Sequence, residues 1–163
     1  MNLGPLAVAR LTEGLREQVR DSVAQGAKLT YGSLDVPDHL AHYGGNFFQP
    51  LVLEDIGTST RAFCEELFGP VFSLYSVKTE QEAIDLANAT DYGLGAALFT
   101  KDLEKAERLA RQLDAGMLYV NDFVQSQSDV PGGGVKYSGY GKECHREGLL
   151  DLSMAKSIVI EKQ

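Results

Sequence analysis

The chain has 163 residues, the size of one domain or of one large part of a bigger protein. Apolar residues make up 44% and charged residues 23%, which is enough for a packed core and excludes wholesale disorder. The net charge of −8 argues against nucleic acid and against an anionic membrane surface as partners. Two cysteines exclude a disulfide framework and indicate a reducing compartment, so we expect a cytoplasmic protein. The sequence contains neither an apolar run of membrane-spanning length nor a secretory signal pattern at its start.

The first third of the chain predicts a helix followed by extended segments. The helix, over 11–23, is indicated by apolar residues spaced four apart, namely Leu11, Leu15, Val19 and Val23. A short strand over 28–31 and a surface loop over 32–46 follow. A second extended stretch covers 47–56, and because Pro50 interrupts it we expect an edge strand there.

From residue 60 onward, helices and strands alternate. A short helix over 60–67 ends at Gly69-Pro70, and the apolar run 71–77 predicts a buried strand. Thr79 with Glu82 is a capping-box pattern at the start of the next helix. Further elements are predicted as a strand over 93–100, a helix over 102–113 and a strand over 116–120. This alternation predicts an α/β fold with parallel pairing through crossovers.

The last part of the chain contains a Gly-rich and Ser-rich loop over 126–141, a helix over 142–152 and a terminal strand over 157–161. The glycines at 132–134, 139 and 141 match neither a dinucleotide fingerprint nor a phosphate loop. Two interpretations stay open for this loop, with about equal weight: a mobile surface loop, or a loop that lines a site.

The segment around Glu66 and Phe68 lies at the entrance of the strand predicted over 71–77. A carboxylate at that place can accept hydrogen bonds from two vicinal hydroxyls, and a neighbouring phenyl ring can pack on a flat heterocycle. Judged from these residues alone, a solvated Glu pair with a core Phe is the more common arrangement.

Neither cysteine predicts a nucleophile, because Cys64 and Cys144 lack an evident activating base; side chains of adjacent helical residues diverge, which separates Cys144 from His145. The histidines do not have metal-ligand spacing, so we expect no metal. They are His39, His42 and His145.

Taken in order, these segments resemble the C-terminal portion of the aldehyde dehydrogenase superfamily, over nearly the whole chain. The matching segments are Gly4-Pro5-Leu6, Gly26-Ala27-Lys28-Leu29, Gly45-Asn46-Phe47, Glu65-Glu66-Leu67-Phe68-Gly69-Pro70, Ala87-Asn88, Tyr92-Gly93-Leu94, Val120-Asn121, Gly133-Gly134-Val135-Lys136 and Ser138-Gly139. The resemblance implies a three-layer α/β catalytic subdomain with a largely parallel sheet and a C-terminal oligomerisation strand.

The resemblance also implies roles. Glu66 would hold the nicotinamide ribose hydroxyls of NAD or NADP, and Phe68 would contact the nicotinamide side. The loop over 123–132 would line the aldehyde entrance. Ser126 there resembles the succinate-semialdehyde dehydrogenase group, whose substrate carboxylate a hydroxyl can hydrogen-bond.

Three residues depart from the family pattern. Gly132 replaces the usual Phe, which should widen the substrate pocket, and Asp129 stands where one branch of the group has Arg. Lys142 replaces an Arg, which changes a bidentate contact into a point charge. These departures bear on which small-molecule aldehyde is the substrate.

The resemblance places the family's nucleophilic Cys, general-base Glu and Rossmann domain before Met1. We therefore expect residues 1–152 to be part of a catalytic domain, residues 153–163 to be an oligomerisation strand, and no catalytic residue to lie in this chain. Such a chain should be inactive alone. The alternative is a non-catalytic interaction module that self-associates or binds a full-length or complementary subunit.

Overall fold

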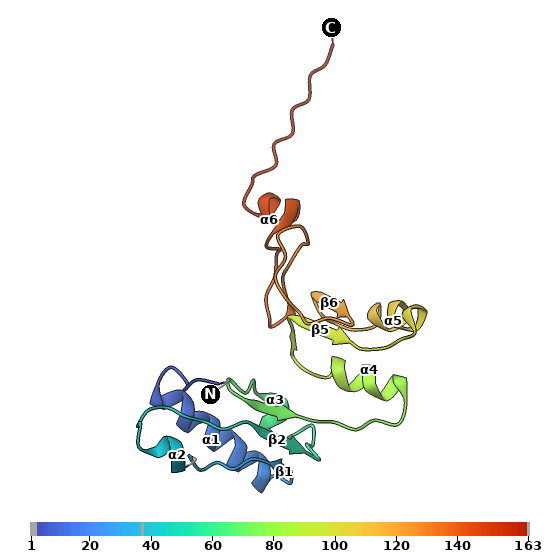
Figure 1. Cartoon of the computed structure of the whole chain (residues 1–163). Helices are drawn as coiled ribbons and strands as arrows, with labels where there is room; N and C mark the ends of the chain where they lie inside the picture. Colours follow the sequence, from blue (N-terminus) through green and yellow to red (C-terminus); the bar gives the residue numbers. More distant parts are fainter. Residues whose placement is uncertain (1–2, 37, 163) are drawn as a thin grey trace. The chain divides into compact units, whose positions relative to one another are not determined.

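The computed structural model describes residues 3–36 and 38–162, apart from the side chains of His39 and Ala41, and these residues form two compact units. Unit 1 is Met1–Val77 and unit 2 is Lys78–Gln163. Met1 itself lies outside the described residues. Figure 1 shows the elements of each unit along the chain. No helix among the described residues combines the length and the apolar character that a membrane crossing requires.

Unit 1 is a three-stranded sheet packed against a long helix. Its elements are α1 (Ala9–Ala24), β1 (Lys28–Tyr31), α2 (Asp38–Ala41), β2 (Leu51–Glu54), α3 (Arg61–Cys64) and β3 (Val71–Ser73). The strand order is β1-β2-β3, with β1 and β2 antiparallel and β2 and β3 parallel. The predicted helix over 11–23 and the strand over 28–31 are confirmed.

The core of unit 1 lies between α1 and β2. Leu15 and Val19 project from α1, and Leu51 and Leu53 project from β2, each 2% exposed or less. They meet because a spacing of four keeps one helix face and a spacing of two keeps one strand face. Each such side chain contributes about 1.5–3 kcal/mol through its burial. This core fixes α1 against the sheet.

The prediction that 47–56 forms an edge strand is wrong, because β2 is the central strand of the sheet. Pro50 lies just before β2, where its missing N–H removes no ladder hydrogen bond. The first ladder donor is instead Leu51 N–H, which donates to Pro70 O at 2.9 Å.

The predicted buried strand over 71–77 is also wrong in extent and in burial. Strand β3 covers only Val71–Ser73, and Phe72 is 63% exposed. Among the described residues of unit 1, β3 pairs with β2 alone, so it lies at one edge of this three-stranded sheet. The helix predicted over 60–67 is shortened to α3, because Glu65 has extended backbone angles that end the helix.

Unit 2 contains α4 (Glu80–Asn88), β4 (Tyr92–Gly93), β5 (Gly95–Leu98), α5 (Leu103–Ala110), β6 (Met117–Val120), β7 (Val135–Lys136) and α6 (His145–Asp151). Strands β5 and β6 pair in parallel and are connected through α5, which confirms the second of the two predicted crossovers. The first is not found, because β3 pairs with β2 and not with β5 among the described residues. Strands β4 and β7 pair antiparallel. The α/β fold class is confirmed, with both parallel and antiparallel pairs.

Side-chain caps begin the two longer helices of unit 2. Thr79 Oγ1 accepts from Glu82 N–H at 3.1 Å, as the capping-box pattern predicts, and Asp102 Oδ1 accepts from Lys105 N–H at 2.9 Å. Helix α6 begins later than the predicted residue 142, because Glu143 is held in a bridge with Gly132.

The terminal segment over 153–162 has no strand assigned, and its apolar side chains are exposed. Ile158, Val159 and Ile160 are 73%, 87% and 84% exposed. None of the described residues pairs with this segment, so the terminal strand over 157–161 stays a prediction.

Candidate functional site

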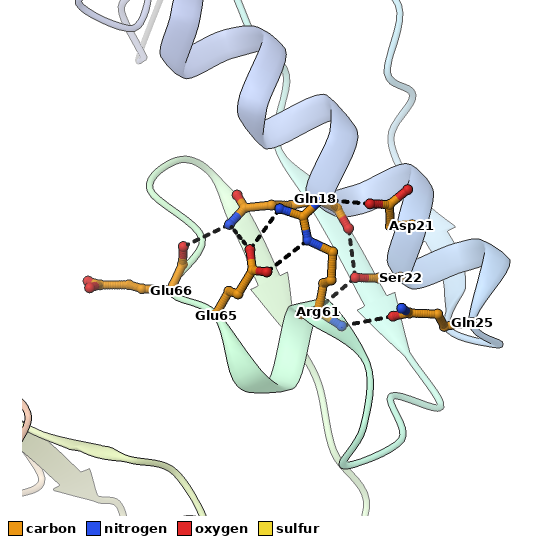
Figure 2. Close-up of polar contacts among 8 residues, drawn as sticks. Gln18, Asp21, Ser22, Gln25, Arg61, Glu65 and Glu66 are labelled. Atoms are coloured by element: carbon orange, nitrogen blue, oxygen red, sulfur yellow. Dashed lines mark hydrogen bonds and ion pairs between the residues drawn. The ribbon is translucent and has the colours of Figure 1, made fainter.

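The segment that carries Glu66 is tied to α1 by Arg61. The Arg61 Nε and Nη2 donate to the two carboxylate oxygens of Glu65, both at 2.9 Å, and Nη1 donates to Asp21 Oδ2 at 2.6 Å. The Arg61 backbone N–H donates to Gln25 Oε1 at 2.9 Å. Figure 2 shows these contacts between α1 and α3. They fix the residues directly before Glu66.

A second set of contacts comes from Gln18. Its Nε2 donates to Glu65 Oε2 at 2.9 Å and to the Glu66 backbone carbonyl at 3.3 Å. Ser22 Oγ donates to Gln18 O at 2.7 Å and accepts from Ala62 N–H at 2.9 Å. The backbone of Glu66 is therefore held in place, while Figure 2 shows its carboxylate extending away from the network.

The Arg61–Glu65 pair is ionised at neutral pH. Hydrogen bonds from Arg61 and then from Gln18 hold the pKa of Glu65 below its usual range. The bonds to Glu65 and Asp21 raise the pKa of Arg61. Both carboxylates thus compensate the guanidinium charge, and the Glu66 carboxylate carries no such partner among the described residues.

A groove of about 310 Å³ runs beside Glu66 and Phe68. Its other lining residues are Arg10, Leu11, Gly14, Leu15, Gln18 and Arg61. Phe68 is 67% exposed, so the alternative of a core Phe is wrong. An unpaired carboxylate beside an exposed ring offers two acceptor oxygens and a flat apolar face. These residues fit the ribose and the heteroaromatic ring of a nicotinamide nucleotide.

Unit 2 contains a larger hollow of about 810 Å³. Ser126 and Gly132, the two predicted pocket residues, both line it, together with Met117, Tyr119, Tyr140 and Lys142. Asp129 is absent from its lining. An ideal Cβ at Gly132 would lie 3.5 Å from Met117 Sδ and 3.9 Å from Glu143 O, both ordinary contact distances. The missing Phe ring therefore leaves open space rather than relieving a clash.

The Gly-rich loop is anchored to the end of α4. Lys136 Nζ donates to Asn88 O at 2.7 Å and to Thr90 O at 3.0 Å. Gly93 N–H donates to Ser138 Oγ at 2.9 Å. Of the two interpretations of this loop, the one in which it lines a site agrees with the hollow. Lys136 and Ser138 as anchors were missed, because their partners lie more than 40 residues away in the sequence.

The two cysteines both lie at the surface. Cys64 and Cys144 are free and exposed, and Cys64 Sγ donates a hydrogen bond to the Thr58 carbonyl at 3.4 Å. Cys144 lines the hollow of unit 2. The adjacent His145 uses its Nδ1 to contact the Glu147 carboxylate. Within residues 3–36 and 38–162, no group of His, Cys, Asp and Glu is arranged to hold a metal ion.

Sequence reasoning also missed Arg10 and Gln18 as lining residues of the groove. The available signal was their spacing with Gly14, since residues four apart share one face of α1.

Comparisons with known proteins agree on one family. A model described as "Aldehyde dehydrogenase family" matches residues 1–158. Succinate-semialdehyde dehydrogenase (NADP(+)) of Deinococcus radiodurans is 44% identical over 156 residues, which cover 96% of this chain and 32% of the relative. The peroxisomal aminoaldehyde dehydrogenase 1 of Pisum sativum is 36% identical over a match that covers 96% of this chain and 30% of the relative. The chain thus spans about a third of the length of the curated relatives it matches.

Solved structures give the same result. Betaine aldehyde dehydrogenase from Staphylococcus aureus in complex with NAD+ has a TM-score of 0.87 at 38% identity, covering 93% of this chain and 30% of that one. Succinic semialdehyde dehydrogenase from Streptococcus pyogenes with NADP+ has a TM-score of 0.83 at 34% identity, and the match covers 91% of this chain and 31% of that one.

Proposed function

Because the chain belongs to the aldehyde dehydrogenase family, we propose that it supplies the nicotinamide-ribose contact and part of the substrate pocket of an enzyme that oxidises an aldehyde to a carboxylic acid. We propose succinate semialdehyde as the substrate and NAD or NADP as the oxidant. The observation that carries this proposal is the 44% identity to a succinate-semialdehyde dehydrogenase over 96% of the chain.

When bound, NAD or NADP would supply the acceptor for the hydride of the aldehyde. Glu66 accepts hydrogen bonds from the two ribose hydroxyls, and the Arg61–Glu65–Gln18 network keeps its backbone in one position. Phe68 packs its exposed ring against the nicotinamide side. Because orientation of the reacting groups lowers the barrier to transfer, these residues act by positioning.

On the substrate side, Ser126 donates a hydrogen bond to the far carboxylate of the semialdehyde, in a hollow that Gly132 leaves wide. Asp129 does not line the hollow, so its carboxylate makes no direct contact with a ligand bound there. Nucleophilic attack on the aldehyde is assigned to a cysteine outside these 163 residues, since the one hydrogen bond of a cysteine sulfur among the described residues joins Cys64 Sγ to a backbone carbonyl and not to a base.

The test is a chimaera in which residues 1–158 replace the corresponding third of the Deinococcus radiodurans relative. We expect the chimaera to oxidise succinate semialdehyde with NADP, and the purified 163-residue chain alone to give no turnover. A folded chimaera without activity would contradict the proposed role of this chain. Turnover by the chain alone would contradict the assignment of the nucleophile.

A second candidate is an interaction module, which the exposed terminal segment favours. Leu152, Met154 and 158–160 together expose a row of apolar side chains that a partner would cover. In this case we expect the chain to self-associate in light scattering, and deletion of 154–163 to make it monomeric. A full chain that is strictly monomeric would exclude this candidate.

A further inference from the structure

Three segments of unit 2 meet at Asn88, the last residue of α4. The Asn88 amide Nδ2 donates to Gln112 O at 2.7 Å, and Asn88 Oδ1 accepts from Asp114 N–H at 2.8 Å. The Asn88 backbone carbonyl accepts from Lys136 Nζ at 2.7 Å. One half-buried residue therefore joins α4 to the connection between α5 and β6 and to the Gly-rich loop.

The two side-chain bonds of Asn88 require an amide. They engage the carbonyl of Gln112 and the N–H of Asp114, as a residue of a neighbouring parallel strand would. An amide offers a donor and an acceptor together, whereas a carboxylate offers only acceptors and a methyl group offers neither. Asn88 thus fixes the backbone of 112–114 in a way that other small side chains do not reproduce.

The backbone that Asn88 fixes leads directly to a residue that lines the hollow of unit 2. Asp114 lies shortly before Met117, which begins β6 and lines the hollow. Between them, an ideal Cβ at Gly116 would lie 1.9 Å from Gly133 O, so the Gly-rich loop lies directly against this backbone. A shift of 112–114 is therefore passed on both to Met117 and to the loop.

The Gly-rich loop is also attached to the end of α4 through Lys136. Besides Asn88 O, Lys136 Nζ contacts Thr90 O at 3.0 Å and Asp114 Oδ2 at 3.6 Å. The backbone φ of Lys136 is 54°, in the left-handed region that a residue other than glycine adopts only at a cost in free energy. These contacts of the ammonium hold that backbone in place. Residues 132–134, which line the hollow, come shortly before it in the chain.

The hollow itself is lined by neither Asn88 nor Lys136 in the described part of the chain, so both act on it through the backbone. Its two sides face each other closely, since an ideal Cβ at Gly132 would lie 3.5 Å from Met117 Sδ. Asn88 holds one side through the residues before Met117 and the other through Lys136.

We propose that Asn88 is a positioning residue, which sets the spacing between Met117 and 132–134 and thereby the place of the aldehyde in the hollow. The proposal rests on the proposed function of that hollow. A small displacement of a bound substrate from the reacting groups lowers the rate of reaction steeply. A residue that sets the spacing of the hollow therefore affects the use of the aldehyde and not the binding of the cofactor, whose proposed contact lies in unit 1.

The test measures the kinetics of the chimaera with the Deinococcus radiodurans relative, using succinate semialdehyde and NADP. Asn88→Ala deletes both side-chain hydrogen bonds and keeps the backbone carbonyl that Lys136 contacts. We expect the KM for succinate semialdehyde to rise about tenfold, because the two sides of the hollow are no longer held at one spacing. The KM for NADP should stay unchanged.

Two further variants test the same joint and its surroundings. Lys136→Met releases the Gly-rich loop and leaves the Asn88 amide in place, so it should also raise the KM for the aldehyde alone. Gln81→Ala removes an amide from the beginning of the same helix, where its partner is Asp85, and should leave both KM values unchanged.

Amide hydrogen exchange in the full 163-residue chain separates positioning from a general loss of stability. In Asn88→Ala, the amide of Asp114 loses its acceptor and should exchange faster, and so should that of Gly116. The amide of Ala106, which donates to Asp102 O at the start of α5, should keep its rate.

The outcomes distinguish this inference from the proposed function beneath it. If Asn88→Ala leaves the KM for the aldehyde unchanged, or raises the KM values for aldehyde and NADP alike, the proposal is wrong. Faster exchange at Ala106 to the same extent as at Asp114 would make Asn88 a residue of general stability, which also overturns it. If the chimaera without substitutions does not oxidise succinate semialdehyde, the proposed function fails, and the role of Asn88 fails with it.

Discussion

Eight buried apolar residues of unit 1 form one cluster between α1, α3 and the sheet, whereas in the described part of unit 2 the buried apolar residues are Ile84 and Ala106. Unit 2 relies instead on close backbone contacts. An ideal Cβ at Gly116 would lie 1.9 Å from Gly133 O, and one at Gly93 would lie 2.5 Å from Asp114 O. Apolar burial thus holds the groove of unit 1, and backbone contacts and side chain–backbone hydrogen bonds shape the hollow of unit 2.

The largest expected effect is in the core of unit 1. Leu53→Ala removes a fully buried side chain and should cost about 2–5 kcal/mol in the free energy of unfolding, measured by denaturant titration. The control is Val52→Ala on the other face of the same strand, where the side chain is half-buried. Equal losses from the two variants would contradict the one-sided core.

The next largest effect is expected in unit 2, where a substitution that adds a methyl group tests the close backbone contacts. Gly116→Ala places a methyl group against Gly133 O and should cost about 1–3 kcal/mol by forcing the loop away from β6. Gly132→Ala, with its nearest contact at 3.5 Å, should be close to neutral. Thermal unfolding of the two variants measures the difference, and similar midpoints would refute the close-contact account of unit 2.

Removal of the ammonium that ties the Gly-rich loop to α4 is expected to have a smaller effect. Lys136→Met loses the hydrogen bonds to Asn88 O and Thr90 O, which should cost about 1–2 kcal/mol. Amide hydrogen exchange of Tyr137, whose N–H donates to Asp91 O, should accelerate. Lys101→Met at an exposed position is the control. Unchanged protection of Tyr137 in Lys136→Met would show that the backbone ladder alone holds the loop.

The smallest expected effect is on how the stability of unit 1 depends on pH. The pKa of Glu65 is lowered in the folded chain, so its contribution to stability is present above the ordinary glutamate value of about 4.3 and is lost as the pH falls through the lowered value. Glu65→Gln should remove this part of the acid sensitivity. Unfolding free energies of both proteins, measured between about pH 6 and about pH 3 where carboxylates titrate, test this loss of acid sensitivity. A wild-type profile that parallels the variant would contradict the ionised Arg61–Glu65 lock.

Local signals in the sequence predicted much of this fold. The apolar stripe predicted α1, and Thr79 with Glu82 predicted the start of α4, because both depend on neighbours within a turn or two. The place of β2 in the sheet and the exposure of Phe72 depend on which strands pair, which periodicity does not encode. For the same reason the Gly-rich motif gave no hint that Lys136 reaches the end of α4.

The candidate site also combines features that depend on near neighbours in the sequence with features that depend on distant ones. Ser126 and Gly132 line one hollow, as residues close in the sequence readily do, and their role as substrate-pocket residues stays a prediction. Glu66 and Phe68 were paired for the same reason, but the groove they line with α1 depends on contacts across more than 40 residues.

The most direct measurement of the central claim is the effect of Glu66→Gln in the chimaera with the Deinococcus radiodurans relative. If Glu66 accepts both ribose hydroxyls, the variant should raise the KM for NADP or lower kcat by about 10–100-fold, the loss expected for charge-assisted hydrogen bonds. Asp85→Asn, in a helix outside both lined sites, should leave both constants unchanged. Unaltered kinetics in Glu66→Gln would contradict the account.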